Sequence, residues 1–196
     1  MNIDDRMTLC NHAAELGAKA AILEADSKTI DWLNAHGAAT PKPVFADADA
    51  VYSDVIQLDT KNLPPQVARK HSVDDIVSAH EVVGQKIQFA LIGTCTNGRL
   101  DDIRQAAAIL KGKKLASGVR MIVTPASRKI YLDALHEGLI EILTRAGASF
   151  ESAGCGTCVG ITNHLVPGNG DTVISTANRN FKRRRSEEHT SELQSH

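Results

Sequence analysis

Apolar residues in the second half of the chain gather into short, nearly continuous runs, and the segments between these runs repeat at helical spacing. The runs predict strands at 87–92, 119–123, 148–151 and 172–175. The segments between them predict helices at 100–111, at 139–146 and around Ile130 and Leu135, the last ending at Gly138. Strands that alternate with helices indicate a parallel sheet whose two faces are both covered. We therefore expect an α/β fold with a doubly wound, mostly parallel sheet.

The first residues of the chain predict a helix that begins at Asp4 or Asp5 and ends at Gly17. An acidic residue caps the start of a helix well, and glycine favours the backbone conformation that ends one. Asn11 and Glu15 lie four residues apart on this helix, so they share one of its faces.

The remainder of the first half is predicted to hold two short strands and one helix. The strands cover 20–23 and 51–58, and the helix runs from Asp26 or Ser27 to Gly37. Proline and aspartate punctuate the segment between the helix and the second strand, which predicts a loop there.

These patterns divide the chain into three parts: a partial α/β domain at 1–86, a second α/β domain at 87–184, and a tail at 185–196. The tail is polar, with Leu193 as its one large apolar residue, and it fits neither a strand nor a helix. It is interpreted either as a solvated, disordered end or as a non-native extension. The second interpretation rests on its resemblance to the translation of a common sequencing-adapter oligonucleotide.

Composition narrows the classes of function. The chain has 196 residues and a formal net charge of −1, which argues against a general nucleic-acid or anionic-membrane binder. No stretch has the character of a transmembrane segment or a secretory signal, so we expect a cytosolic protein. Four cysteines in such a protein favour metal binding or redox chemistry over a disulfide framework.

Three of the cysteines lie in glycine-rich loops that follow predicted strands. Cys155 and Cys158 form a Cys-x-x-Cys pair between Gly154 and Gly160, and Cys95 lies between two glycines after an earlier strand. The carboxyl ends of parallel strands meet at one edge of a sheet, where ligands bind. We therefore expect the three thiols to converge at that edge, together with Asn178 and Arg179, which follow the last predicted strand.

Several kinds of site use thiols in this pattern. The pair Cys155 and Cys158 alone would serve as a redox dithiol or as half of a zinc site, which His71, His136 or His164 could complete. Three cysteines with no obvious fourth ligand favour instead a cubane iron–sulfur cluster with one open iron. Arg179 and Arg184 would suit a carboxylate ligand, although the basic run at 182–185 is also typical of a solvated surface.

These motifs resemble those of the large subunit of the aconitase superfamily, in its branch of archaeal-type 3-isopropylmalate dehydratase and homoaconitase. The matching segments are Leu91-Ile92-Gly93-Thr94-Cys95-Thr96-Asn97-Gly98-Arg99, Gly154-Cys155-Gly156-Thr157-Cys158-Val159-Gly160, Asn178-Arg179-Asn180-Phe181, and Arg6-Met7-Thr8-Leu9-Cys10-Asn11 with Glu15. The resemblance implies an aconitase-like α/β/α fold, incomplete here, and a hydro-lyase that dehydrates a hydroxy-acid such as 3-isopropylmalate and rehydrates it at the adjacent carbon.

The resemblance also implies a role for each matching residue. Cys95, Cys155 and Cys158 would bind a [4Fe-4S] cluster. Substrate would contact Asn11, Asn178, Arg179 and Arg184, and Glu15 would act as the catalytic residue that hydrogen-bonds the hydroxyl or water on the open iron. His12 and Arg183 depart from the residues usual in the family, and the second departure weakens the assignment of Arg184.

The family's acid pair and serine base have no counterpart in this sequence. In the family, an additional first domain supplies the acid pair, and a swivelling domain or separate small subunit supplies the base. We therefore expect the chain to be a fragment of a large subunit that needs a small subunit and does not turn over substrate alone. The alternative is a noncatalytic zinc-binding or redox module that uses Cys155 and Cys158.

Overall fold

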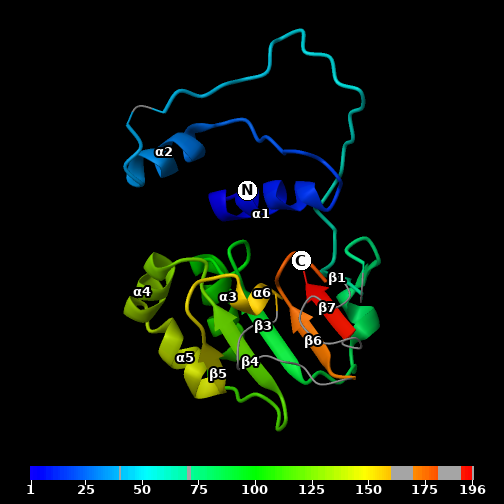
Figure 1. Ribbon diagram of the computed structural model, residues 1–196, viewed down its shortest axis with the longest axis vertical. Helices are drawn as coiled ribbons and strands as arrows, with labels where there is room; N and C mark the ends of the chain where they lie inside the picture. The colour runs from blue at the N-terminus through cyan, green and yellow to red at the C-terminus, as the bar shows by residue number, and fades with distance from the viewer. Residues whose placement is uncertain (40, 70–71, 160–169, 181–190, 196) are drawn as a thin grey trace. The chain divides into compact units, whose positions relative to one another are not determined.

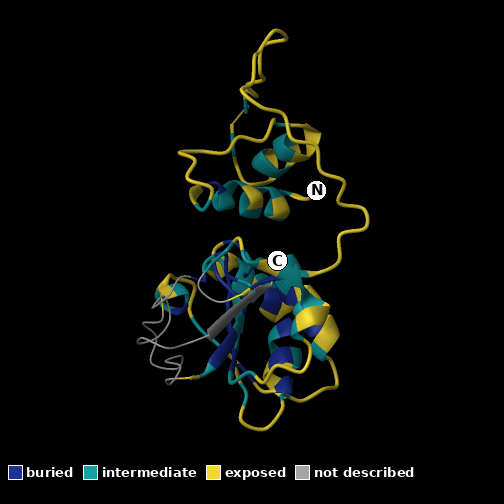
Figure 2. Ribbon diagram, turned by 90° about the vertical axis from the view of Figure 1, so that its right-hand side faces the viewer, coloured by how far each residue is buried: buried dark blue, intermediate teal, exposed yellow. Residues whose placement is uncertain are grey.

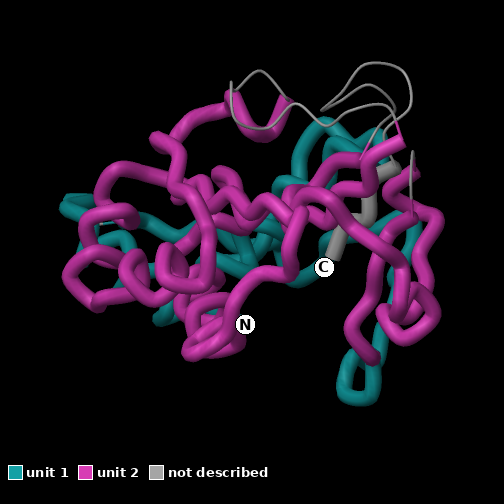
Figure 3. The backbone as a smooth tube through the Cα atoms, turned by 90° about the horizontal axis from the view of Figure 1, so that it is seen from below, with its two compact units in different colours: residues 1–63 teal, residues 64–196 magenta. Residues whose placement is uncertain are grey.

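The computed structural model describes residues 1–39, 41–69, 72–159, 170–180 and 191–195. Its contacts divide the chain into two compact units, Met1–Leu63 and Pro64–His196, which Figure 3 distinguishes by colour. The sequence pattern placed this boundary later, between 86 and 87. The difference arises because two strands of three residues each, too short to be recognised as apolar runs, join the sheet of the second unit.

The first unit is built on two helices, α1 (Ile3–Asn11), which a 3-10 turn extends, and α2 (Ser27–Ala35). Both predicted helices are confirmed, although α1 begins earlier than expected. Its cap is Asn2, whose side chain accepts a hydrogen bond from the Asp5 amide at 2.7 Å, while the Asp5 carboxylate accepts one from the Asn2 amide. Such a reciprocal capping box satisfies two backbone donors that a helix start otherwise leaves without partners.

One ion pair joins the two helices of this unit. The guanidinium of Arg6 donates to both carboxylate oxygens of Asp26, at 2.6 and 2.8 Å, and to the hydroxyl of Thr29 at 2.9 Å. Asp26 also caps α2 by accepting from the Thr29 amide. The Arg6 hydrogen bonds, and then the Thr29 amide, hold the pKa of Asp26 well below its usual value.

The strands predicted at 20–23 and 51–58 are wrong. Both segments lack regular secondary structure, and their apolar side chains are exposed, Ile22 at 88% and Val51 at 95%. Within the described residues of the first unit only Ala13 is buried (Figure 2). A short apolar run forms a strand only where a neighbouring strand accepts its backbone hydrogen bonds, and the described part of this unit has no sheet.

The second unit contains a sheet with the strand order β2-β1-β7-β6-β3-β4-β5 (Figure 1). The strands are β1 (Gln66–Ala68), β2 (Ile76–Ser78), β3 (Phe89–Gly93), β4 (Arg120–Thr124), β5 (Ala148–Phe150), β6 (Thr172–Ser175) and β7 (Ser191–Ser195). Strands β6, β3, β4 and β5 run parallel, while β1 pairs antiparallel with β2 and β7. The expected α/β class and mostly parallel sheet are confirmed.

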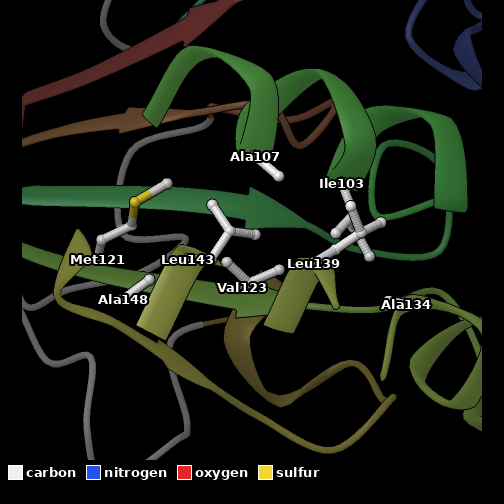
Figure 4. Close-up of a cluster of buried hydrophobic side chains, with 8 residues drawn as sticks. All are labelled: Ile103, Ala107, Met121, Val123, Ala134, Leu139, Leu143 and Ala148. Atoms are coloured by element: carbon white, nitrogen blue, oxygen red, sulfur yellow. The ribbon is translucent and has the colours of Figure 1, made fainter. Parts of the chain in front are cut away.

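Helices pack on one face of this parallel sheet. They are α3 (Leu100–Leu110), α4 (Arg128–His136) and α5 (Leu139–Ala146); the shorter turns are η2 (Ala79–Val82) and α6 (Gly156–Val159). Figure 4 shows their buried side chains meeting those of β4 and β5, in a cluster of Ile103, Ala107, Met121, Val123, Ala134, Leu139, Leu143 and Ala148. A second cluster holds the alternate residues of the strands, Phe89, Leu91, Ile122 and Val173, with Ala177. Since side chains alternate along a strand, these two clusters lie on opposite faces of the sheet.

The end of the chain differs from expectation in its described part. The pattern predicted a tail without structure at 185–196, whereas Ser191–Ser195 forms β7, parallel to β6 and antiparallel to β1. Pairing with two neighbours depends on backbone groups, so a strand between other strands does not require apolar side chains.

Candidate functional site

The strand order reverses at β3. The chain passes from β3 to β4 and β5 on one side, and then returns to place β6 on the other side of β3. The connections that leave β3 and β6 therefore diverge, and in open α/β sheets ligands bind in the crevice at such a point. The loop after β3 carries Cys95, and the segment after β6 carries Asn178 and Arg179. The topology thus supports the edge of the sheet that the sequence singled out.

The loop after β3 exposes Cys95 and buries its neighbours. Thr94 and Thr96 are 3% and 7% exposed, whereas Cys95 is classed as exposed. The loop closes through a hydrogen bond from the Gly98 amide to the Thr94 carbonyl at 2.9 Å. A Cβ at Gly98 would lie 2.2 Å from the Thr124 carbonyl oxygen, so the backbones that follow β3 and β4 approach too closely for any other residue.

The Cys155 and Cys158 segment shows the same alternation. Thr157, between the two cysteines, is 1% exposed, while Cys155 is exposed and Cys158 is partly buried. The Thr157 hydroxyl hydrogen-bonds the hydroxyl of Thr124, at the carboxyl end of β4, over 2.8 Å. Figure 1 shows the short helix α6, which contains Thr157, beside that end of the sheet. This bond fixes the second cysteine loop to the strand that adjoins β3.

The segment after β6 is tied directly to the Cys95 loop. The Thr176 hydroxyl accepts from the Gly93 amide at 3.0 Å and contacts the Gly93 carbonyl at 3.1 Å. The Asn97 side-chain amide donates to the Thr176 carbonyl and, over 3.1 Å, to Asn178 Oδ1, which also accepts from the Thr96 hydroxyl at 3.2 Å. Asn178 is 3% exposed and Arg179 is partly buried. Two segments about 80 positions apart in the sequence therefore form one hydrogen-bonded unit.

The structure thus brings together the loops that hold Cys95, Asn178 and Arg179, and it fixes the Cys155 and Cys158 loop to the adjoining strand. No described cysteine forms a disulfide. Within the described residues, no group of three or more His, Cys, Asp and Glu side chains is arranged to hold a metal ion.

The other predicted site residues lie in other parts of the chain or outside the described residues. Asn11 ends α1, and Glu15 follows the 3-10 turn after it, so both belong to the first unit. Arg184 lies outside the described residues, as do two of the three histidines considered as zinc ligands, His71 and His164. His136 is the last residue of α4.

Residues that the sequence did not single out hold the site together. Asn97, Thr176 and the pair Thr124 and Thr157 make the bonds that join the loops. Each follows a strand end closely or lies between two cysteines, so its position along the chain was a usable signal. The hydrogen-bond partner of each residue could not be predicted from the sequence, because a threonine or asparagine after a strand is also common in turns that belong to no functional site.

Comparison with known proteins shows the family to which the chain belongs. A family model described as the Aconitase family (aconitate hydratase) matches residues 1–86 and 78–196. The chain belongs to the aconitase family. The resemblance inferred from the cysteine loops and the Asn178 motif is therefore confirmed at the level of the family.

Three relatives within the aconitase family illustrate the match. The chain is 46% identical over 185 residues to the 3-isopropylmalate dehydratase large subunit 2 of Archaeoglobus fulgidus, covering 94% of this chain and 44% of the relative. It is 46% identical to the probable methanogen homoaconitase large subunit of Methanosarcina mazei, covering 94% and 46%. It is 45% identical to the 3-isopropylmalate dehydratase large subunit of Elusimicrobium minutum, covering 94% and 44%. The chain spans just under half the length of these curated relatives.

None of the described helices is both long enough and apolar enough to cross a membrane.

Proposed function

We propose that this chain is the cluster-bearing part of a hydro-lyase large subunit, in which Cys95, Cys155 and Cys158 bind a [4Fe-4S] cluster. The substrate is a hydroxy-acid such as 3-isopropylmalate, and a separate small subunit completes the enzyme. The names of the relatives support this proposal, since they are large subunits of 3-isopropylmalate dehydratase and of homoaconitase.

The observation that carries the proposal is the alternation of buried threonines and accessible thiols in two loops at one edge of the sheet. Thr94, Thr96 and Thr157 are buried, whereas Cys95 and Cys155 are exposed and Cys158 is partly buried. A cluster is bound by cysteines that are free of disulfide bonds, as these three are. The described side chains do not gather three such groups into a metal site, so the proposal rests on the thiols themselves and on the relatives.

The chain's other residues would bind and orient the acid. When bound, the cluster would supply an iron without a cysteine ligand, which acts as a Lewis acid toward the substrate hydroxyl. Arg179 would hold a substrate carboxylate through a two-pronged hydrogen bond, and Arg184 would hold a second one. Glu15 would hydrogen-bond the hydroxyl that leaves or returns, and Asn11 would orient the acid beside it.

Anaerobic reconstitution with iron and sulfide tests this function. The full chain should develop broad visible absorption, and Cys95→Ser should abolish that absorption because it removes one of three thiolates. Cys10→Ser is the matched control: it removes the fourth cysteine, in α1, and should leave the absorption intact. A metal or redox module built on Cys155 and Cys158 alone would be indifferent to Cys95→Ser, and that result would overturn the proposal.

A further inference from the structure

Asn180 is fully buried, and its side chain joins the segment after β6 to a turn more than 100 positions earlier in the chain. Its nitrogen Nδ2 donates to the Arg69 carbonyl at 2.7 Å and to the Ser72 carbonyl at 3.0 Å, both in the turn between β1 and β2. A carbonyl oxygen only accepts hydrogen bonds, so the group of Asn180 that faces the turn must be its NH2 group. The two hydrogens of that group serve the two carbonyls, and a side chain with fewer donors could not hold both.

The turn that Asn180 holds is closed by contacts of its own. The Arg69 amide donates to the Asp75 carbonyl at 2.8 Å, and the Arg69 guanidinium donates to both carboxylate oxygens of Asp75. Directly after Asp75 the chain enters β2, which pairs with β1. Asn180 is therefore attached to a turn that the hairpin of β1 and β2 already shapes.

The oxygen of the same amide indicates that these two hydrogen bonds are what the position of Asn180 requires. The described residues donate no hydrogen bond to Asn180 Oδ1, although this oxygen is buried. A buried acceptor without a donor destabilises a fold, so an apolar side chain of similar size would suit this position better if it only filled space. Conflicts of this kind between a residue and its surroundings are expected at functional sites.

Arg179 lies between two asparagines that are attached to different parts of the sheet. Asn178, 3% exposed, is bonded to the loop after β3, whereas Asn180, 0% exposed, is bonded to the turn after β1. In the strand order, β1 and β3 lie on opposite sides of β6. The backbone of Arg179 is thus held from both sides, while its own side chain is only partly buried.

We propose that Asn180 is a positioning residue, which fixes the backbone of Arg179 by tying it to the turn between β1 and β2. A guanidinium holds a carboxylate through two parallel hydrogen bonds only from a matching direction, so the backbone that carries it must be held still. The role of Arg179 toward the acid rests on the proposed function. The anchoring of its backbone does not, because it comes from contacts within the chain.

The first test uses the cluster-free chain and the NMR order parameter of the Arg179 backbone amide. In Asn180→Ala this order parameter should fall from about 0.85, typical of rigid backbone, toward roughly 0.6, because one of the two attachments is lost. Gln105→Ala removes an exposed amide on α3 and should leave it unchanged. A rigid Arg179 in a folded Asn180→Ala chain would overturn the inference.

The second test uses the reconstituted chain with 3-isopropylmalate as the probe. The concentration of acid that half-saturates the change in the visible cluster spectrum should rise roughly tenfold or more in Asn180→Ala, since a small misplacement of a binding group costs this much. The spectrum without acid should match the wild type, which a general loss of structure would not allow. Arg179→Ala should show at least as large a rise, and adding Asn180→Ala to it should have no further effect. Additive effects would mean that Asn180 does not act through Arg179.

Asn180→Ser covers the case in which Asn180→Ala does not fold. Serine keeps a polar group at the buried position, but its single hydroxyl can donate to only one of the two carbonyls. The order parameter of Arg179 should fall and the half-saturating concentration of acid should rise in this variant, and wild-type values of both would contradict the inference. If the wild type itself forms no cluster, the proposed function fails, while the order parameter still decides the role of Asn180.

Discussion

At the scale of single residues, buried threonines anchor the loops that carry the cysteines. Thr157 is buried and bonded to Thr124, while Cys155 before it is exposed and Cys158 after it is partly buried. The sequence identified the cysteines, because the spacing of thiols and glycines has few structural explanations. It did not identify Thr157 as the residue that anchors their loop, since the sequence does not show that the fold places the hydroxyl of Thr124 beside it.

Replacing Thr157 by valine should destabilise the second unit. Valine keeps the shape but leaves the hydroxyl of Thr124 without this partner in a fully buried position. The cost of such a group is about 1–3 kcal/mol, measurable by denaturant unfolding. Thr157→Ser retains the hydroxyl and should unfold closer to the wild type. Equal stabilities for the valine variant and the wild type would show that the bond does not hold the loop.

Gly98 and Gly154 offer a matched pair of substitutions in the two cysteine loops. An added Cβ at Gly98 would meet backbone oxygens of Thr124 and Thr94 at 2.2 and 2.6 Å, whereas at Gly154 the nearest atom lies 4.0 Å away. Gly98→Ala should lower the free energy of unfolding by about 1–3 kcal/mol, as overpacking does. Gly154→Ala should have little effect in the same denaturation experiment. Equal effects of the two changes would contradict the close approach of β3 and β4.

At the scale of secondary-structure elements, the helices with clear end signals were predicted best. Helix α5 was predicted at its observed bounds, because Gly138 and Gly147 flank it with φ of 72° and 112°, a conformation that glycine adopts without strain. The strands at 20–23 and 51–58 were predicted wrongly because an apolar run shows hydrophobicity but not the presence of a pairing partner. The three-residue strands β1 and β2 were not predicted, because pairing with each other makes them strands although neither forms a long apolar run.

Acid should separate α1 from α2 through Asp26. Arg6 lowers the pKa of Asp26 in the folded chain. The ionised carboxylate therefore stabilises the helix pair at any pH above about 3.9, the pKa of aspartate in an unfolded chain, and this stabilisation is lost as the pH falls below that value. Trp32, the single tryptophan, lies on α2, and its fluorescence should change below about pH 4.

Asp26→Asn separates the ion pair from the helix cap. Asparagine caps a helix about as well as aspartate, so α2 should persist while the charge is lost. In this variant the contact between α1 and α2 should already be weakened at neutral pH. Its Trp32 fluorescence should then show no change below pH 4 that arises from residue 26. The ring of His36, stacked on Trp32, is present in both proteins, so its effect on the fluorescence is the same in both. The same acid step in both would rule out Asp26 as its origin.

At the scale of the whole molecule, the chain combines one well-packed unit with one that buries little. The buried side chains of the described residues lie almost entirely in Pro64–His196 (Figure 2). The sequence anticipated the parallel sheet and the edge at which the cysteine loops lie, since both follow from strand and helix alternation. It did not anticipate the division after Leu63, which depends on which distant segments pair.

Limited proteolysis should reflect this division. The segment at 41–63 has no regular secondary structure and carries exposed apolar side chains, including Val44, Val55 and Ile56. Proteases cut such segments first, so brief digestion should give a resistant product that begins near Pro64. Mass spectrometry of the product identifies its first residue. Primary cleavage within β3 or α5 instead would contradict the stable unit.

The proposed function depends on three thiols that share one cluster with an open iron. Mössbauer spectroscopy of the full chain, reconstituted anaerobically with iron-57 and sulfide, measures this most directly. We expect a cubane spectrum in which the signal of a single iron changes when 3-isopropylmalate is added, because Cys95, Cys155 and Cys158 would hold the other three irons. A spectrum of isolated thiolate-bound iron, or a cubane in which no iron responds to the acid, would contradict it.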